Sequence, residues 1–164
     1  MPRIVISGGP GAGKTTLLGE LAALGYATVE ESARAIIAER LAAGESRRPD
    51  PLTFAREILR RDVEKYRRSK EATDWVFFDR GVVEALGMLH EASLLAPCEL
   101  AAMLSAYPFQ TPVFILPPWE AIYVMDAERD HTFAEAVGVH AKVVEWYRSC
   151  GYSVHEVPRL PAGQ

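Results

Sequence analysis

Short apolar runs alternate with longer amphipathic stretches along most of the chain. The runs rich in β-branched and aromatic residues predict strands at residues 3–7, 26–29, 75–79, 113–116 and 152–157. The stretches between them repeat apolar residues at helical spacing and predict helices over residues 16–24, 33–41, 52–66, 82–92, 98–106 and 133–147. Because strands and helices alternate, we expect an α/β fold with a parallel sheet, and the last run alternates like an edge strand.

Four of the predicted helices have an apolar face that we expect to pack against a core. These faces consist of residues 17, 18, 21 and 24; residues 33, 36, 37 and 41; residues 52, 55, 59, 63 and 66; and residues 133, 137, 141, 144 and 147.

Residues 8–15 match the phosphate-binding pattern Gly, any four residues, Gly, Lys, Ser or Thr. They follow a predicted strand and precede a predicted helix, which favours a nucleotide site over a structural glycine turn. Glycines let successive N–H groups turn toward a phosphate, Lys14 adds a positive charge, and Thr15 offers a hydroxyl to Mg²⁺. The expected nucleotide contacts are Gly8, Gly9, Pro10, Gly11, Ala12, Gly13, Lys14, Thr15 and Thr16.

A second candidate lies where the strand at residues 75–79 ends in Asp79 and Arg80. A carboxylate at the tip of a strand beside the phosphate loop is suited to Mg²⁺, and the adjacent arginine can reach a phosphate. The alternative is that Asp79 caps a helix starting near Val82 while Arg80 covers surface.

Glu30 and Glu31 follow the second predicted strand in the same way. One of them would accept the proton of a substrate hydroxyl or help to order Mg²⁺, with Arg34 as a weaker substrate contact. The structural alternative is equally open, because acids in a first turn are stabilised by the helix dipole and Thr28 to Glu31 has capping-box spacing.

The helix over residues 52–66 carries many charges next to its apolar face. Its basic residues interleave with Glu57 and Glu64 at helical spacing, which predicts a solvated, salt-bridged face rather than a site for a substrate anion. These basic residues are Arg56, Arg60, Arg61, Arg67 and Arg68.

Residues 117–135 lie between the fourth strand and the last helix and have mixed charge with no firm strand pattern. Phosphoryl transfer needs water excluded and charge stabilised, so we expect a helical lid here that carries Arg129. An ordinary helical hairpin with Arg129 on its surface is the alternative.

Composition narrows the possible partners. The chain has 164 residues, enough for one domain spanning residues 1–164, and a net charge of −4 that argues against a general nucleic-acid or membrane-surface binder. Cys98 and Cys150 are far apart and the histidines lack metal-ligand spacing. We therefore expect a cytoplasmic protein with reduced thiols.

Together these motifs resemble a group of small bacterial P-loop ATPases, often labelled AAA-type, that is related to the ribosylnicotinamide kinase domain. The resemblance covers nearly the whole chain and rests on residues 8–15, 29–34, 77–81, 117–120 and 126–129. It implies a three-layer P-loop NTPase fold with a parallel five-stranded sheet in the order 2-3-1-4-5, flanked by helices, and an arginine-bearing lid. The label does not imply a motor, because the chain has no room for the additional helical domain of a ring ATPase.

A small-molecule kinase is the first functional hypothesis. Lys14 would contact the β- and γ-phosphates of ATP or GTP, and Thr15 and Asp79 would bind Mg²⁺. Glu30 or Glu31 would position an unidentified small-molecule acceptor.

Arg80 and Arg129 would stabilise the charge of the transferring group. A nucleotide hydrolase or switch is the main alternative, and a nucleotide-binding interaction module without turnover is the third. The chain has no asparagine, so it lacks the Asn-Lys-x-Asp guanine reader of Ras-like GTPases.

Overall fold

A computed structural model of the chain describes residues 2–47, 49–72, 74–124 and 132–160. Its helices and strands gather into two units, which we describe separately. Unit 1 comprises Met1–Val29, Ala72–Asp79 and Phe109–Gln164, and unit 2 comprises Glu30–Glu71 and Arg80–Pro108.

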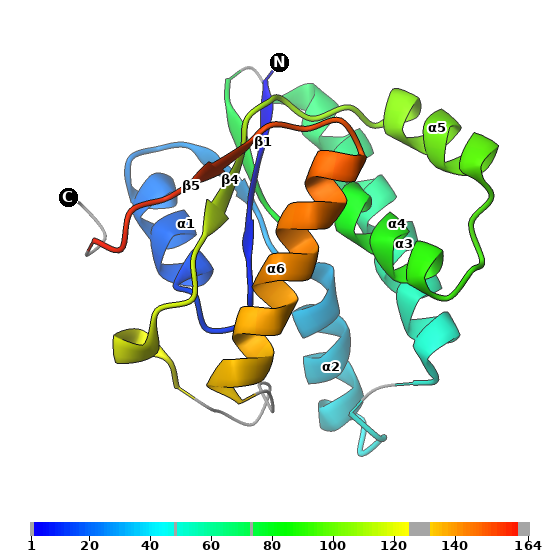
Figure 1. The fold of residues 1–164 in the computed structure, drawn as a ribbon, viewed down its shortest axis with the longest axis horizontal. Helices are drawn as coiled ribbons and strands as arrows, with labels where there is room; N and C mark the ends of the chain where they lie inside the picture. Colours follow the sequence, from blue (N-terminus) through cyan, green and yellow to red (C-terminus); the bar gives the residue numbers. More distant parts are fainter. Residues whose placement is uncertain (1, 48, 73, 125–131, 161–164) are drawn as a thin grey trace. The chain divides into compact units, whose positions relative to one another are not determined.

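Unit 1 contains a parallel sheet in the order β2-β3-β1-β4-β5 (Figure 1). Its strands are β1 Arg3–Gly8, β2 Ala27–Val29, β3 Val76–Asp79, β4 Val113–Leu116 and β5 Val154–Glu156. The α/β class, the strand order and the edge position of the last strand are confirmed. In the register, Asp79 lies opposite Ile6 and Leu116 lies opposite Gly8, so β3 and β4 flank the strand that leads into the glycine loop.

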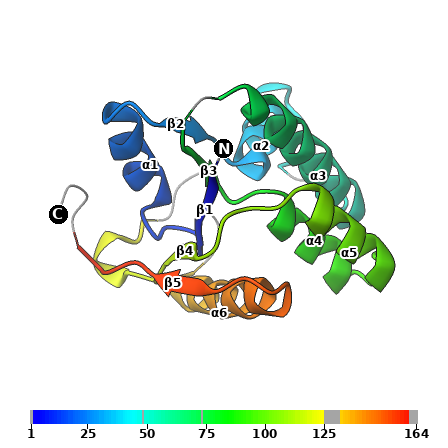
Figure 2. The ribbon, with the colours of Figure 1, turned by 90° about the horizontal axis from the view of Figure 1, so that it is seen from above.

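Two helices of unit 1 cover opposite faces of this sheet (Figures 1 and 2). They are α1, Lys14–Ala23, and α6, Phe133–Ser149. From β1 the chain crosses toward one edge of the sheet and from β4 toward the other, so right-handed crossovers place the two helices on opposite faces. One core cluster consists of Ile6, Ala12, Leu18 and Leu116.

The predicted apolar faces of these two helices are partly wrong. Leu24 is 75% exposed because it is the C-cap of α1, beyond the last turn. In α6 the buried residues are Ala136 and Tyr147, about three turns apart, whereas Val137 points away and is 43% exposed. The buried residues of α6 therefore lie on a helix face next to the predicted apolar face.

Unit 2 consists of helices, namely α2 Ser32–Ala42, α3 Pro51–Arg68, the short 3₁₀ helix η1 Ser69–Glu71, α4 Val82–Glu91 and α5 Pro97–Ala106. The start of α3 has a clear local cause. Asp50 accepts a 3.0 Å hydrogen bond from the Thr53 N–H, and Pro51 occupies the first helical position. No helix in the described ranges is long and apolar enough to cross a membrane.

The buried face of α3 differs from the predicted one. Its fully buried residues are Phe54, Ala55, Ile58, Asp62 and Tyr66, whereas Leu59 and Val63 are only half-buried. Phe54 and Ile58 pack with the α2 residues Ile36 and Ile37. Leu41, near the end of α2, is 44% exposed. The predicted stripe therefore combined two neighbouring faces of α3, one in the core and one at the surface.

Three of the five predicted basic residues of α3, namely Arg60, Arg61 and Arg68, form ion pairs along the helix, as predicted. Arg61 Nε lies 2.7 Å from Glu57 Oε1, Arg60 Nη2 lies 2.8 Å from the same oxygen, and Arg68 pairs with Glu64. Hydrogen bonds from Arg60 and Arg61 lower the pKa of Glu57 to about 2. Arg61 also reaches Glu39 of α2 at 2.7 Å and so links the two helices.

Candidate active site

The glycine loop follows β1 and ends at the first residue of α1. Gly11 has a φ of 72°, and a Cβ there would lie 2.5 Å from the Tyr123 ring. A Cβ on Gly9 would lie 2.6 Å from the carbonyl oxygen of Ala136. These two positions therefore exclude side chains for steric reasons, because α6 and the segment after β4 approach the loop closely.

Lys14 is the first residue of α1 and is buried, with 7% of its surface exposed. Its Nζ donates hydrogen bonds to the carbonyl oxygen of Gly9 at 2.9 Å and to that of Gly8 at 3.3 Å. The side chain thus folds back over the loop and holds a positive charge at the N-terminus of a helix. Both features favour an anion such as a phosphate.

The other predicted contacts of the loop differ in their exposure. Thr15 and Thr16 are exposed in the first turn of α1, Pro10 is half-buried, and Ala12 belongs to the core. Gly13 is the N-cap of α1 in the left-handed conformation and makes no side-chain cap. Thr15 is therefore accessible from solvent, as an ion ligand at this position requires.

Asp79 is the last residue of β3 and is buried, with 9% of its surface exposed. The predicted alternative, in which Asp79 caps α4, is wrong, because Gly81 is the N-cap and no side chain caps that helix. In the described ranges no group of three His, Cys, Asp or Glu gathers into a metal site. The predicted pair of ligands, the Thr15 hydroxyl and the Asp79 carboxylate, suits Mg²⁺, because this ion takes its remaining oxygen ligands from phosphates and water.

In unit 2, Arg80 has a φ of 61°, which is unusual for a residue with a side chain. Its Nε lies 3.3 Å from Glu31 Oε1, and its Nη1 lies 3.1 Å from Glu84 Oε2. All three side chains are largely shielded from solvent. The structure thus holds Arg80 between two carboxylates rather than spread over the surface.

Glu30 and Glu31 have different environments. Glu30 is exposed, and its carbonyl oxygen accepts a 2.6 Å hydrogen bond from Lys65 Nζ. Glu31 is the N-cap residue of α2, but its side chain makes no cap, and the first turn contains no acid. The predicted capping box from Thr28 is therefore wrong. Arg34 is half-buried in the first turn of α2.

The predicted lid falls partly outside the described residues. Residues 125–131, which include Arg129, are not among the described residues, so the role of Arg129 stays a prediction. In the described part, Glu120–Ile122 form a short 3₁₀ helix, η2, and Tyr123 packs edge-on against Phe133 with ring centroids 5.6 Å apart. The segment after β4 therefore covers the glycine loop through the same tyrosine.

Comparison with known proteins assigns the family. A family profile described as an AAA domain matches residues 3–163. The chain belongs to this AAA domain family. It is a P-loop nucleotide-binding domain, and the phosphate-loop geometry above agrees with this membership. A sequence comparison with curated proteins gives no match.

Several solved kinases share the fold of this AAA domain. Deoxyadenosine kinase from M. mycoides with bound dATP has a TM-score of 0.60 and 15% identity, covering 96% of this chain and 91% of the kinase. Thymidylate kinase from Ehrlichia chaffeensis has a TM-score of 0.55 and 18% identity, covering 96% and 93%. Shikimate kinase from Acinetobacter baumannii in complex with shikimate has a TM-score of 0.53 and 18% identity, covering 99% and 87%. The fold is therefore that of P-loop small-molecule kinases.

The sequence interpretation missed a buried polar pair in unit 2 of this AAA domain. The Ser32 hydroxyl, at the start of α2, donates a hydrogen bond to Asp62 of α3, and both residues are buried. Burial raises the pKa of Asp62 to about 6, an effect that Ser32 and Lys65 oppose and Glu84 strengthens. A signal was present, because Asp62 continues the line of Phe54, Ile58 and Tyr66 at four-residue spacing.

Proposed function

We propose that this AAA domain is a small-molecule kinase that transfers the γ-phosphoryl group of Mg-ATP to a hydroxyl of a small metabolite. The burial of Lys14 against the loop carbonyls carries the proposal, because it places a fixed cation where outer phosphates bind. The likeness of the fold to P-loop kinases supports the reaction class.

The donor nucleotide would be held by unit 1. The loop N–H groups and Lys14 would bind the phosphates, and Thr15 and Asp79 would hold Mg²⁺. Bound Mg²⁺ supplies charge neutralisation on the phosphate oxygens. The acceptor oxygen forms a bond to phosphorus while the bond to the leaving ADP oxygen breaks, and the proton of the acceptor hydroxyl passes to a carboxylate.

We assign that carboxylate to Glu31 rather than to the exposed Glu30. Glu31 is shielded from solvent and held by the Arg80 guanidinium, so its position is fixed, as a general base requires. Arg80 would hold Glu31 in position, and Arg129 of the predicted lid would stabilise charge on the transferring group.

The charges around Glu31 also indicate the kind of acceptor. Arg80 is neutralised by two carboxylates, and Lys65 is engaged with the Glu30 carbonyl. A substrate that itself carries a phosphate or carboxylate would add a further negative charge beside the carboxylates of Glu31 and Glu84, which already share the Arg80 cation. We therefore propose an uncharged, hydroxyl-bearing acceptor such as a nucleoside or a sugar.

ADP formation from Mg-ATP, measured with a panel of acceptors, tests the proposal. We expect nucleosides and pentoses to stimulate turnover, while nucleoside monophosphates and shikimate do not. Lys14→Ala should abolish all turnover, and Glu31→Gln should lower kcat much more than the matched Glu30→Gln. Hydrolysis that no acceptor accelerates would contradict the kinase and favour the hydrolase. Stimulation only by anionic acceptors would contradict the acceptor class alone.

A further inference from the structure

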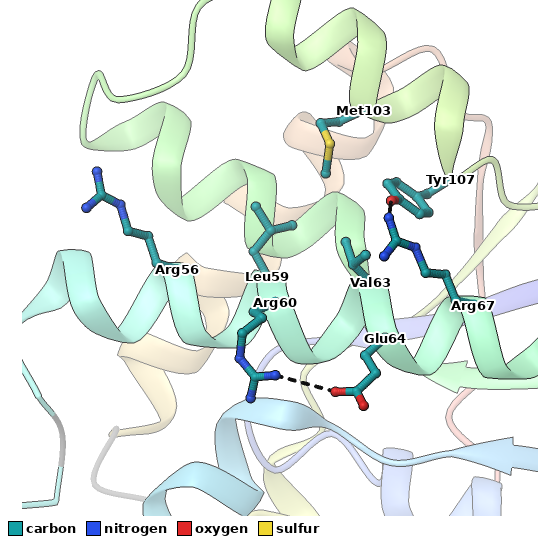
Figure 3. Close-up of a pocket in the computed structure, with 8 residues that line it drawn as sticks. All are labelled: Arg56, Leu59, Arg60, Val63, Glu64, Arg67, Met103 and Tyr107. Carbon is teal, nitrogen blue, oxygen red and sulfur yellow. Dashed lines mark hydrogen bonds and ion pairs between the residues drawn. The ribbon is translucent and has the colours of Figure 1, made fainter.

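A groove of about 480 Å³ runs between α3 and α5 in unit 2, and none of its lining residues is one proposed for catalysis. Its floor consists of the side chains of Leu59 and Val63 from α3, of Met103 from α5 and of Tyr107, the C-cap residue of α5 (Figure 3). Figure 3 shows Leu59 and Val63 pointing toward the α5 side chains. The groove therefore presents a continuous apolar surface.

Helix α5 is unusual for its composition. Nine of the ten residues in its sequence, PCELAAMLSA, are uncharged, Glu99 being the exception, yet none of them is fully buried. An apolar helix that buries no residue leaves apolar surface exposed, and such patches commonly mark binding sites. This second observation indicates that α5 has a partner.

The rim of the groove is basic although the chain as a whole is acidic. Three arginines and one glutamate line it, whereas the net charge of the chain is −4. Arg60 and Arg68 share the glutamate, Glu64. The rim therefore has a net positive charge that ion pairs along α3 do not compensate.

Arg56 and Arg67 mark the two ends of this rim. Neither has a carboxylate partner in the part of the chain that the structure describes. Arg67 is held in place by Tyr107, since its Nη2 donates a 2.8 Å hydrogen bond to the tyrosine oxygen and its Cζ lies 5.8 Å from the ring centroid. The two arginines share one face of α3, separated by three turns or about 16 Å.

We infer that the groove binds an acidic amphipathic helix of a partner protein. Carboxylates three turns apart would pair with Arg56 and Arg67, and apolar side chains between them would cover Leu59, Val63 and Met103. A helix fits because it repeats its side chains with the same spacing as α3 itself. This inference is independent of the proposed kinase activity.

Fluorescence anisotropy with two synthetic peptides tests the inference on the full chain. One labelled helical peptide carries glutamates three turns apart with leucines between them on the same face, and its twin carries lysines in place of the glutamates. We expect the acidic peptide to bind at least about tenfold more tightly than its twin. Replacing Arg56 and Arg67 together with glutamine should weaken binding by about fivefold for each lost pair.

Two further variants sharpen the test. Met103→Glu places a charge in the floor and should abolish binding, while Arg148→Gln removes an equal charge from α6 and should have no effect. Circular dichroism checks that each variant is folded, and the exposed double-arginine variant keeps the test valid if Met103→Glu unfolds. Equal binding of both peptides would overturn the inference. So would dimerisation that Met103→Glu blocks, because the occupant would then be a second copy of this chain.

Discussion

Replacing Asp62 with asparagine is expected to stabilise the protein at neutral pH. Burial raises the pKa of Asp62 from an ordinary value of 3.8 to about 6 in the folded state. Well below pH 4 the carboxyl is protonated in both the folded and the unfolded state, whereas well above pH 6 it must be ionised inside the folded protein. Stability therefore falls as the pH rises through this window, by about 3 kcal/mol. The amide of the variant carries no charge, and its oxygen can still accept from Ser32.

Urea unfolding followed by circular dichroism between pH 4 and pH 8 measures this effect. The stability of Asp62→Asn relative to the native chain should increase by about 2 kcal/mol from pH 4 to pH 7. Asp50→Asn, at the N-cap of the same helix, is the matched control, because a hydrogen bond from Thr53 lowers the pKa of the exposed Asp50. Its relative stability should change with pH in the opposite direction. A difference between Asp62→Asn and the native chain that does not vary with pH would refute the reasoning.

Three further predictions concern the loop, the ion pairs and the core. Gly11→Ala should weaken binding of an ATP analogue at least about tenfold in calorimetric titration, because the new Cβ collides with Tyr123. Arg80→Gln should lower the free energy of unfolding by about 1–3 kcal/mol, since it leaves the carboxylates of Glu31 and Glu84 without their shared cation. Ile58→Ala should lower it by about 2–5 kcal/mol in urea while leaving the affinity for the ATP analogue unchanged.

The phosphate loop and the strands around it were predictable because their signals are local. The glycines, Lys14 and Thr15 are contiguous in the chain, and the strand before them is a short run of apolar residues. Asp79 was predictable for the same reason, as an acid directly at the end of an apolar strand. The order of the strands came only from the resemblance to a family, because pairing is a long-range property.

Contacts between distant segments were not predictable from the pattern. The sequence interpretation proposed Glu31 and Arg80 separately, but nothing local indicated that they pair or that Glu84 completes the group. The helical period also cannot choose between two adjacent apolar faces of α3. For that reason the buried Asp62 was overlooked, and Leu59 and Val63 were expected in the core although they line the groove.

Tryptophan fluorescence can test the predicted lid. Trp119 lies just before η2, in the segment whose Tyr123 covers Gly11. If this segment rearranges when phosphates enter the loop, the surroundings of Trp119 must change. A variant with Trp75 and Trp146 replaced by phenylalanine retains Trp119 as its single tryptophan.

In that variant, Mg²⁺ with a non-hydrolysable ATP analogue should shift the emission of Trp119. The same addition should have no effect when Lys14→Ala is also present, because the loop has then lost its buried cation. An unchanged spectrum, at analogue concentrations where calorimetry shows binding, would mean that the segment is a fixed wall of the nucleotide site. The proposed kinase would then need water excluded by another part of the chain, since phosphoryl transfer to a metabolite competes with transfer to water.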